Sequence, residues 1–465
     1  MARKFKQVDY AEVVQINLRV GDCVAAGHLA RFVAEVMALL DLSAIYARYG
    51  SRGAPAYAPE ILLGLLFYGY ATGVFSSRRI EQSTKESLPF IFIAGGLHPD
   101  HDTLASFRKT FLPEIKLLFI QVLLIAEAAG VLKLGRISLD GTKLHADASK
   151  SQAVSYKRLL ELEVQLSTEV EQLLKLAERA DQGEPLPPGW VIEEEVVHRQ
   201  ERLAGLAEAK AVILARAEQR YASEQAAYEA KLQEREDKAR ASGRKPRGRA
   251  PVAPTPGARD ADQYNFTDPD SRIMKNSTNQ GFDQHYNAQV AVDQDSLLIV
   301  GQSLSNHPND QAEAQPTLEA IPPALGTPSS AALDNGYFSA ANIEHFKALR
   351  IDPYIATGRD PHHPSWHERF AQSLTPPPEQ ASPKVKMAYK LQTEIGKAIY
   401  RLRKCTVEPV IGIIKETLAF RQFSLRGLSH VAGEWALVCL SFNLKRLHTL
   451  TNGQLPPLRI SPTGC

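Results

Sequence analysis

Two aspartates end short apolar runs of the chain, where their carboxylates could bind a metal ion. Asp140 follows alternating apolar residues in ISLDG, and Asp334 follows a continuous apolar run in AALDNG. Both sequences continue with residues that favour turns, as expected at the end of a β-strand. The two acids are 194 positions apart. An acid at a strand tip can hold a metal or simply end the sheet, and two acids with the same layout suggest one shared site.

A third acid, Glu408, lies in a later stretch with helical spacing. Two acids at strand ends and one on a helix could hold two Mg²⁺ ions, because this cation prefers oxygen ligands and keeps several waters. Two such ions activate a water or hydroxyl and stabilise the leaving oxygen of a phosphodiester. Glu408 is flanked by apolar residues, among which an unpaired carboxylate would be costly to bury. Lys404 and Lys415 lie on roughly the same helical face, so a Glu–Lys surface pair is the alternative, and periodicity alone favours it.

The composition is that of an ordinary globular protein. The chain has 465 residues, 44% hydrophobic and 23% charged, so two to four domains with ample core are expected. Because the net charge is only +2, any role with nucleic acid must rest on local patches. The four cysteines lack Cys-x-x-Cys spacing, which argues against a disulfide framework or structural zinc and favours a reducing cytoplasm. The sequence shows no signal peptide, and its longest apolar segment is too short and too broken to span a membrane.

Basic residues lie on two of the helices expected in the N-terminal region, residues 1–115. Arg78 and Arg79 fall in the first turn of a helix opened by serines that can cap it. Arg108 and Lys109 lie on the helix that follows a Gly/Pro connector. This arrangement resembles a DNA-binding helix-turn-helix motif. A small helical bundle with solvated arginines is an equally good interpretation of this region alone.

Two long amphipathic helices are expected in the middle of the chain. Leucines recur at roughly heptad spacing, and a second stretch in similar register follows a Pro/Gly-rich breaker. They predict a helical hairpin over 152–235, most simply an insertion packed on itself. A basic, proline-rich linker at 238–260 is expected to be poorly ordered; it could contact phosphates or be a solvated loop. The apolar positions are Leu159, Leu162, Leu166, Leu173 and Leu176, then Ile192, Val196, Leu203, Leu206 and Ile213.

Strands and helices alternate in the rest of the chain. Period-two patterning predicts a strand within 135–150, and a β-hairpin begins at 282 with 293–295 as its turn. A further strand ends at Leu333, a helix and another strand follow, and the region from about 384 to 449 is helical. Interleaved strands and helices predict an α/β sheet layered with helices.

These stretches resemble the DDE transposases of bacterial insertion sequences. LDGTKLHADAS resembles the segment with the family's first aspartate, ALDNGYFS the segment with the second, and YRLRKCTVEPVIGIIK the helix with its glutamate. YNFTDPDSRIMKN is similar to a segment found where the catalytic core resumes after an insertion, and the N-terminal helices are similar to the domain that precedes the core. The resemblance covers nearly the whole chain, and three motifs in the right order are far more specific than any one.

The resemblance implies a fold and its division into domains. The fold is α/β, an RNase-H-like mixed sheet with flanking helices, preceded by an all-α N-terminal domain and interrupted by a helical-hairpin insertion. The implied helical DNA-binding domain is 1–120, and the implied catalytic core is 130–151 with 262–450. The insertion with its basic linker is 152–261.

The resemblance also implies that Asp140, Asp334 and Glu408 are the catalytic, metal-binding triad, with Mg²⁺ as cofactor and Mn²⁺ as a substitute. Their carboxylates should then lie within about 10 Å of one another, because the two ions of such sites are about 3.5–4 Å apart. Asp147 is a competing acid, but it lies seven residues after Asp140, so strand alternation would aim it at the opposite face.

The family's signature helix commonly carries tyrosine, arginine, glutamate and lysine, and this chain departs from the usual spacing at the arginine. Tyr400, Glu408 and Lys415 fit the pattern. Arg403 is one residue further from the glutamate than usual, and Lys404 stands where the arginine is expected. Lys415, with Arg403 or Lys404, would contact backbone phosphate.

The resemblance implies a transposase that binds the terminal inverted repeats of its own element, cleaves the DNA and joins it to target DNA. Asn335 and Tyr337, beside the second aspartate, are candidates for shaping the path of the DNA strand. A homodimer on double-stranded DNA, no contact with membranes and a bacterial, nucleoid-associated cytoplasmic location are expected. One rival is a DNA-binding regulator with an inactive core, which intact acids at all three positions oppose. The other is an RNase-H-like nuclease without strand transfer, which the N-terminal helical region opposes.

Overall fold

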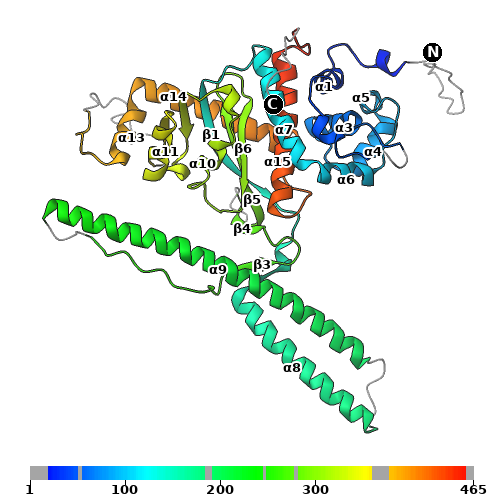
Figure 1. Cartoon of the computed structure of the whole chain (residues 1–465), viewed down its shortest axis with the longest axis vertical. Coiled ribbons are helices and arrows are strands. Elements are labelled where there is room, and N and C mark those ends of the chain that lie inside the picture. Colours follow the sequence, from blue (N-terminus) through cyan, green and yellow to red (C-terminus); the bar gives the residue numbers. More distant parts are fainter. Residues whose placement is uncertain are drawn as a thin grey trace, which may run out of the picture. The chain divides into compact units, whose positions relative to one another are not determined.

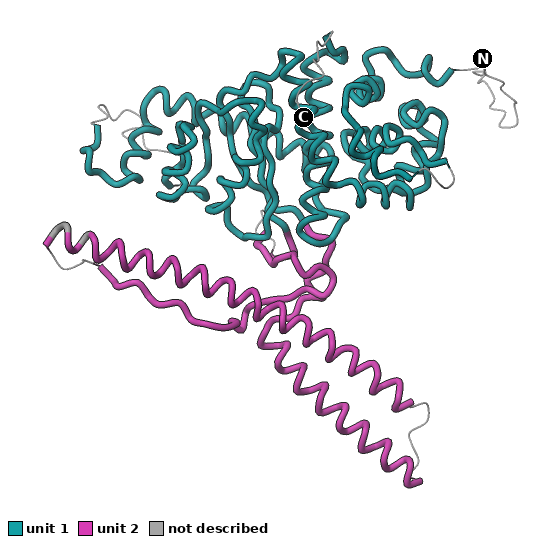
Figure 2. The backbone as a smooth tube through the Cα atoms, viewed as in Figure 1, with its two compact units in different colours: residues 1–144, 286–465 teal, residues 145–285 magenta. Residues whose placement is uncertain are grey.

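The computed structural model combines helices with a mixed sheet, as the α/β prediction requires (Figure 1). Its two compact units are coloured in Figure 2: unit 1 comprises Met1–Leu144 and Tyr286–Cys465, and unit 2 comprises His145–His285. The structure describes residues 19–50, 55–183, 191–243, 248–276, 281–358 and 376–456.

Helices make up the first part of unit 1, as predicted. The central one, α3, begins at Pro59, where a missing N–H costs nothing, and is followed by Gly73 in the left-handed region, with φ of 83°. Most of its side chains are buried all round, so it forms the centre of the bundle. The elements of this part are η1 (Val20–Cys23), α1 (Leu29–Met37), α2 (Ser43–Tyr46), α3 (Pro59–Thr72), α4 (Ser77–Glu86), α5 (Leu88–Ile93), α6 (His101–Thr110) and α7 (Leu112–Ala128).

A mixed sheet follows, with the strand order β6, β5, β1, β7, β8, and with β4 beside the first residues of β5. β7 is parallel to β1, and β8 is parallel to β7. β5 and β6 form the predicted antiparallel hairpin. β5 is also antiparallel to β1, since Gln294, just after β5, donates its N–H to the carbonyl of Arg136 at the start of β1. The strands are β1 (Arg136–His145), β4 (Arg272–Lys275), β5 (Phe282–Asp293), β6 (Ile299–Ser305), β7 (Ser330–Leu333) and β8 (Asp352–Ile355).

The C-terminal helix α15 (Leu428–Leu450) joins the helical bundle to the sheet. It packs against α3 and α7 and also against β6. The buried Trp435 donates its indole N–H to the backbone carbonyl of Gln289 (3.1 Å), and Asn443 exchanges two hydrogen bonds with the backbone of Ile299. The N-terminal helices, expected as a domain of their own over 1–120, therefore share one compact unit with the sheet. The other elements of unit 1 are α10 (Ala314–Glu319), η3 (Pro323–Leu325), η4 (Asn335–Tyr337), α11 (Ala340–Ala348), α13 (Pro383–Gln392), α14 (Glu394–Gly412) and the π-helical turn η5 (Ile413–Thr417).

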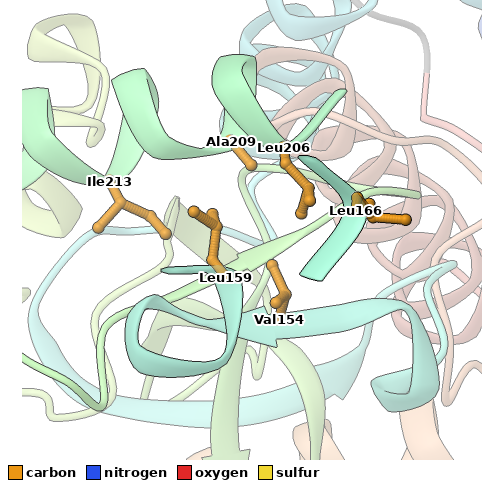
Figure 3. Close-up of a cluster of buried hydrophobic side chains, with 6 residues drawn as sticks. All are labelled: Val154, Leu159, Leu166, Leu206, Ala209 and Ile213. Atoms are coloured by element: carbon orange, nitrogen blue, oxygen red, sulfur yellow. The ribbon is translucent and has the colours of Figure 1, made fainter. Parts of the chain in front are cut away.

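Unit 2 contains the predicted helical hairpin, made of α8 (Tyr156–Asp181) and the longer α9 (Ile192–Ser242). Four of the expected apolar positions, Leu159, Leu166, Leu206 and Ile213, meet between the two helices (Figure 3). The unit also contains η2 (Lys150–Gln152) and the strand pair β2 (Ala153–Ser155) and β3 (Gln263–Asn265). The buried side chains of this core are Val154, Leu159, Leu166, Leu206, Ala209 and Ile213.

The segment after α9 differs from the poorly ordered linker expected at 238–260. α9 itself continues to Ser242, and residues 244–247 lie outside the described residues. The part from 248 onward is hydrogen-bonded to α9: Arg235 donates to the carbonyl of Arg249 (3.0 Å), and Arg259 pairs with Glu224 (2.9 Å). Composition alone does not predict these contacts, because they depend on partners on α9.

Among the described residues, no single helix is long and apolar enough to cross a membrane. By length and composition together, α3 and α4 would be long and apolar enough as a pair, but this pair is bent by 98°.

Candidate active site

The two aspartates of the sequence motifs lie side by side on neighbouring strands. The parallel ladder pairs Arg136 with Ser330 and Ser138 with Ala332. The residues of each pair are 194 positions apart, as Asp140 and Asp334 are. If the ladder is continued two residues beyond Ser138 and Ala332, these two acids therefore lie opposite one another. Neighbouring strands lie about 4.8 Å apart, which brings both carboxylates to one edge of the sheet.

Only one of the two acids ends its strand. Asp334 follows β7 and caps η4, where its carboxylate accepts the N–H of Gly336 (2.8 Å). Asp140 lies within β1, which continues to His145 because β5 pairs with its other side. The prediction of a turn at Asp140-Gly141 is therefore wrong. Glycine suits this position for another reason: a Cβ there would clash with the side-chain amide of Gln289 and lie 2.7 Å from Oδ1 of Asp310.

Arg403, on α14, connects the first aspartate with Glu408. Its Nη1 lies 2.7 Å from Oδ2 of Asp140, and its Nη2 lies 3.4 Å from Oε1 of Glu408. The side chains of Arg403 and Asp140 are 9% and 18% exposed, whereas that of Glu408 is 50% exposed. Glu408 is thus not buried among apolar residues, although its neighbours in sequence suggested that it would be. The carboxylate of Glu408 binds the guanidinium of Arg403 from the solvent side, whereas Asp140 binds it from the more buried side.

Hydrogen bonds to β1 place α14 and the turn after it. Thr406 donates to the hydroxyl of Ser138 (2.8 Å), which fixes the helix against the strand two residues before Asp140. Pro409 interrupts the helical ladder after Glu408, and the π-helical turn η5 follows. There Lys415 turns toward β1 and donates to the hydroxyl of Thr142 (3.1 Å).

Burial dominates the electrostatics of the acids. It raises the pKa of Asp140 from 3.8 to about 6; the charge of Arg403 opposes this rise, and the charge of Asp334 adds to it. Burial likewise raises the pKa of Asp334. Burial alone would lower the pKa of Arg403, but the nearby charges of Asp140 and Asp334 leave it raised. The pKa of Lys415 is lowered by burial. Negative charge is therefore concentrated here with one guanidinium to balance it.

We expect Asp140→Asn to raise the free energy of unfolding at pH 8, in chelator, by an amount on the order of 1–3 kcal/mol. The folded-state pKa of Asp140 lies above its unfolded value, so the native state carries a penalty for the ionised carboxylate. That penalty is absent below pH 4, grows between pH 4 and 6, and is complete above pH 6. Urea unfolding of both proteins at pH 4 and pH 8 measures it. An equal difference at both pH values would contradict the raised pKa.

The structure separates the residues that the sequence suggested for DNA contact. Arg78, Arg79 and Lys109 are exposed on α4 and α6, and Asn335 is exposed beside Asp334. Arg108 is instead buried and bound to Tyr70, Phe75 and Glu434, so its guanidinium is not available to a phosphate.

Tyr337 is also fully buried, and its hydroxyl donates to the side chain of Gln289, so it cannot contact a strand of DNA. Of the two candidates for the signature arginine, Arg403 enters the site and Lys404 faces solvent. Arg403 is occupied by acids here rather than free for phosphate. Arg108 and Tyr337 were therefore wrongly expected to contact DNA. Both have apolar neighbours in sequence, but only their partners far along the chain reveal their internal roles.

Sequence reasoning missed two features near the site. Asp310, in the loop after β6, lies against the residues that follow both aspartates. A cavity of about 800 Å³ is lined by Lys397, Arg401 and Lys404 of α14 together with Tyr400. The spacing of four and then three residues between these bases was a usable signal, since it places them on one helical face. Asp310 had no such signal, because it lies in an irregular loop.

The three acids offer carboxylate oxygens to a cation. Among the residues that the structure describes, no three His, Cys, Asp or Glu side chains are arranged to hold a metal ion. The guanidinium of Arg403 lies 2.7 Å from the carboxylate of Asp140 and 3.4 Å from that of Glu408, and it supplies positive charge there. Carboxylate oxygens are the ligands that Mg²⁺ and Mn²⁺ prefer. A site that already stabilises a cation with hard oxygen donors is chemically suited to these ions.

Two family models match the chain. A transposase domain (DUF772) matches residues 19–110, which contain the helices from η1 to α6. A transposase DDE domain matches residues 367–448, which contain Arg403, Glu408 and Lys415. No curated protein and no solved structure matches the chain. Over these two segments the matches support the resemblance to DDE transposases of insertion sequences that the sequence shows.

Proposed function

We propose that this protein binds the ends of an insertion sequence, cleaves the DNA there with the help of divalent metal ions, and joins the freed ends to target DNA. The observation that carries the proposal is the convergence of three acids from distant parts of the chain. Asp140 and Asp334 are set opposite one another by the parallel register, and Glu408 binds the same guanidinium as Asp140.

The topology supports an RNase-H-like core. β1 lies in the middle of the sheet, with the antiparallel hairpin β5–β6 on one side and the parallel strands β7 and β8 on the other. Asp140 lies on this central strand, Asp334 follows its parallel neighbour, and Glu408 comes from the later helix α14. This arrangement supports the RNase-H-like core that the resemblance implies.

In this proposal Asp140, Asp334 and Glu408 hold Mg²⁺, or Mn²⁺ in its place. The ions would supply an activated water or 3′-hydroxyl and charge stabilisation at the leaving oxygen of the phosphodiester. A DNA phosphate is a suitable further partner for the guanidinium of Arg403, which donates to one oxygen of Asp140 in this structure. Lys415, whose ammonium lies near Thr142, is a point charge for the phosphate backbone next to the acids.

Double-stranded DNA is the partner that this chemistry requires, as both element ends and target. A homodimer on the paired ends and an association with the bacterial nucleoid extend the same proposal. Exposed bases on α14 beside the cavity, and Arg78, Arg79 and Lys109 on the N-terminal helices, support contacts to the phosphate backbone.

The test uses DNA fragments that carry the paired inverted repeats flanking the gene. Purified full-length protein with Mg²⁺ and a circular target plasmid should yield both cleaved ends and joined products. Binding without cleavage would favour the regulator with an inactive core. Cleavage without joined product would favour a nuclease that lacks strand transfer. Either result would overturn the proposed function.

A paired substitution of Arg78 and Arg79 by alanine should weaken binding to the element ends and lower the salt slope by about two, one for each lost phosphate contact. Both residues lie in the first turn of α4, where the helix dipole disfavours positive charge, so they contribute little to the helix itself. Gel-shift titrations across salt concentrations measure the slope. The matched control removes Lys175 and Arg179, two exposed bases on α8. Equal losses in both variants would show a general charge effect rather than a local contact.

A further inference from the structure

Four polar side chains form a hydrogen-bonded network next to the two aspartates. Asn287 and Gln289 belong to β5, Asp310 to the loop after β6, and Tyr337 to the turn after Asp334. Asn287 and Gln289 are each 1% exposed, and Tyr337 is fully buried. Groups buried to this degree must satisfy one another's hydrogen bonds, so the network has one preferred arrangement.

Asp310 determines which way the amide of Gln289 points. The amide N–H of Gln289 donates to Oδ1 of Asp310 (2.8 Å) and to the side-chain oxygen of Asn287 (3.0 Å). Asn287 donates to the same oxygen of Asp310 (2.8 Å). The carbonyl oxygen of Gln289 is therefore left to accept the hydroxyl of Tyr337. A reversed amide would set its oxygen against Asp310, where two acceptors would face each other.

The network leaves little room for a side chain at the glycines next to both aspartates. Gly141 follows Asp140, and a Cβ on it would lie 2.7 Å from Oδ1 of Asp310. Gly336, whose N–H binds the carboxylate of Asp334, would place a Cβ 3.4 Å from Oδ2 of Asp310. Asp310 thus lies between the strand that carries the first acid and the turn that carries the second.

We propose that Asp310 is a positioning residue, which fixes the spacing of Asp140 and Asp334 by accepting hydrogen bonds from Asn287 and Gln289 and thereby anchoring Tyr337. The inference rests on the proposed function, since the spacing matters for binding the divalent ions. Asp310 acts here as a hydrogen-bond acceptor, because its Oδ1 accepts from both Asn287 and Gln289 of β5 (2.8 Å each). Partners that orient ligands typically change metal affinity by about 10–100-fold when they are removed.

The acceptor role predicts different results for two substitutions of Asp310. Asp310→Asn keeps an oxygen that can accept from both amides, so Mn²⁺ affinity should stay close to that of the wild type. Asp310→Leu keeps the size but leaves two buried N–H groups unpaired, so Mn²⁺ affinity should fall about 10–100-fold. Tyr337→Phe removes only the anchoring hydroxyl, fills the same space, and should reproduce the direction of the loss. This third variant carries the test if Asp310→Leu does not fold.

Mn²⁺ titration followed by electron paramagnetic resonance, with full-length protein bound to pre-cleaved end DNA, measures affinity without turnover. Gel shifts on the same samples should show unchanged DNA binding, which excludes a general loss of structure. If Asp310→Asn loses as much affinity as Asp310→Leu, the charge of Asp310 matters and it is a ligand, which overturns the proposal. If no variant differs from the wild type, the network does not position the acids.

The same titration separates this inference from the proposed function. If the wild type binds no Mn²⁺, or if Asp140→Asn binds it equally well, the metal site itself is wrong. If wild-type binding depends on Asp140 but is insensitive to Asp310→Leu and Tyr337→Phe, only the positioning role fails.

Discussion

Asp140→Asn is expected to lower the rate of element-end cleavage by about three orders of magnitude or more. Asparagine keeps the shape and one oxygen of the side chain, but it removes the negative charge that a hard divalent cation requires. Loss of electrostatic stabilisation at a transition state typically costs several kcal/mol, and each 1.36 kcal/mol is a factor of ten in rate. The structure strengthens this expectation, because Asp140 is the most enclosed member of the acid set and the partner of Arg403.

DNA binding by Asp140→Asn should be retained or slightly tightened, because it rests on basic residues and one repulsive charge is gone. The assay pairs end cleavage in Mg²⁺ with gel shifts across salt. Asp147→Asn is the matched control, since the same change seven residues later should leave cleavage intact. If Asp140→Asn abolishes binding while pre-bound DNA is still cut, the metal-ligand role of Asp140 is wrong and a regulator with an inactive core becomes the better explanation.

Arg108→Ala and Glu434→Ala are each expected to lower the free energy of unfolding by about 3–5 kcal/mol. Glu434 is fully buried, accepts the N–H groups of Ser424 and Leu425 (3.0 Å each), and lies 3.9 Å from Arg108. Tyr70 connects the pair: its hydroxyl receives a hydrogen bond from Arg108 (2.7 Å) and donates to Glu434 (3.1 Å). Removing either partner leaves a buried charge without compensation.

Urea unfolding measures this loss, and Lys109→Ala is the matched control. Lys109 is exposed next to Arg108 on the same helix, so its removal should change stability by less than about 0.5 kcal/mol. The measurement also decides between two roles for Arg108. If Arg108→Ala leaves stability unchanged but abolishes DNA binding, the DNA contact suggested by the sequence is right and the internal role described here is wrong.

The sequence by itself predicted many of the elements and suggested the three acids. Heptad spacing predicted the hairpin of α8 and α9, and alternation predicted β1 and the β5–β6 pair, because both periods follow from backbone geometry within a few residues. The acids were found from motifs with a resemblance to a known family, and Asp334 was placed correctly at the end of its strand. The continuation of β1 beyond Asp140 was missed, because it depends on pairing with β5 rather than on the Asp-Gly turn signal.

Only the tertiary structure decided what each charged side chain does. Arg403 and Asp140 are 263 positions apart, and nothing near either residue predicts their ion pair. Arg108 and Lys109 are adjacent and both basic, yet one is buried against Glu434 and the other is exposed. Asp310 gained its partners from β5 and from the turn after Asp334. The physical reason is range: backbone propensity and hydrophobic periodicity act between neighbours in sequence, whereas the partner that compensates a buried charge is brought to it only when the chain folds.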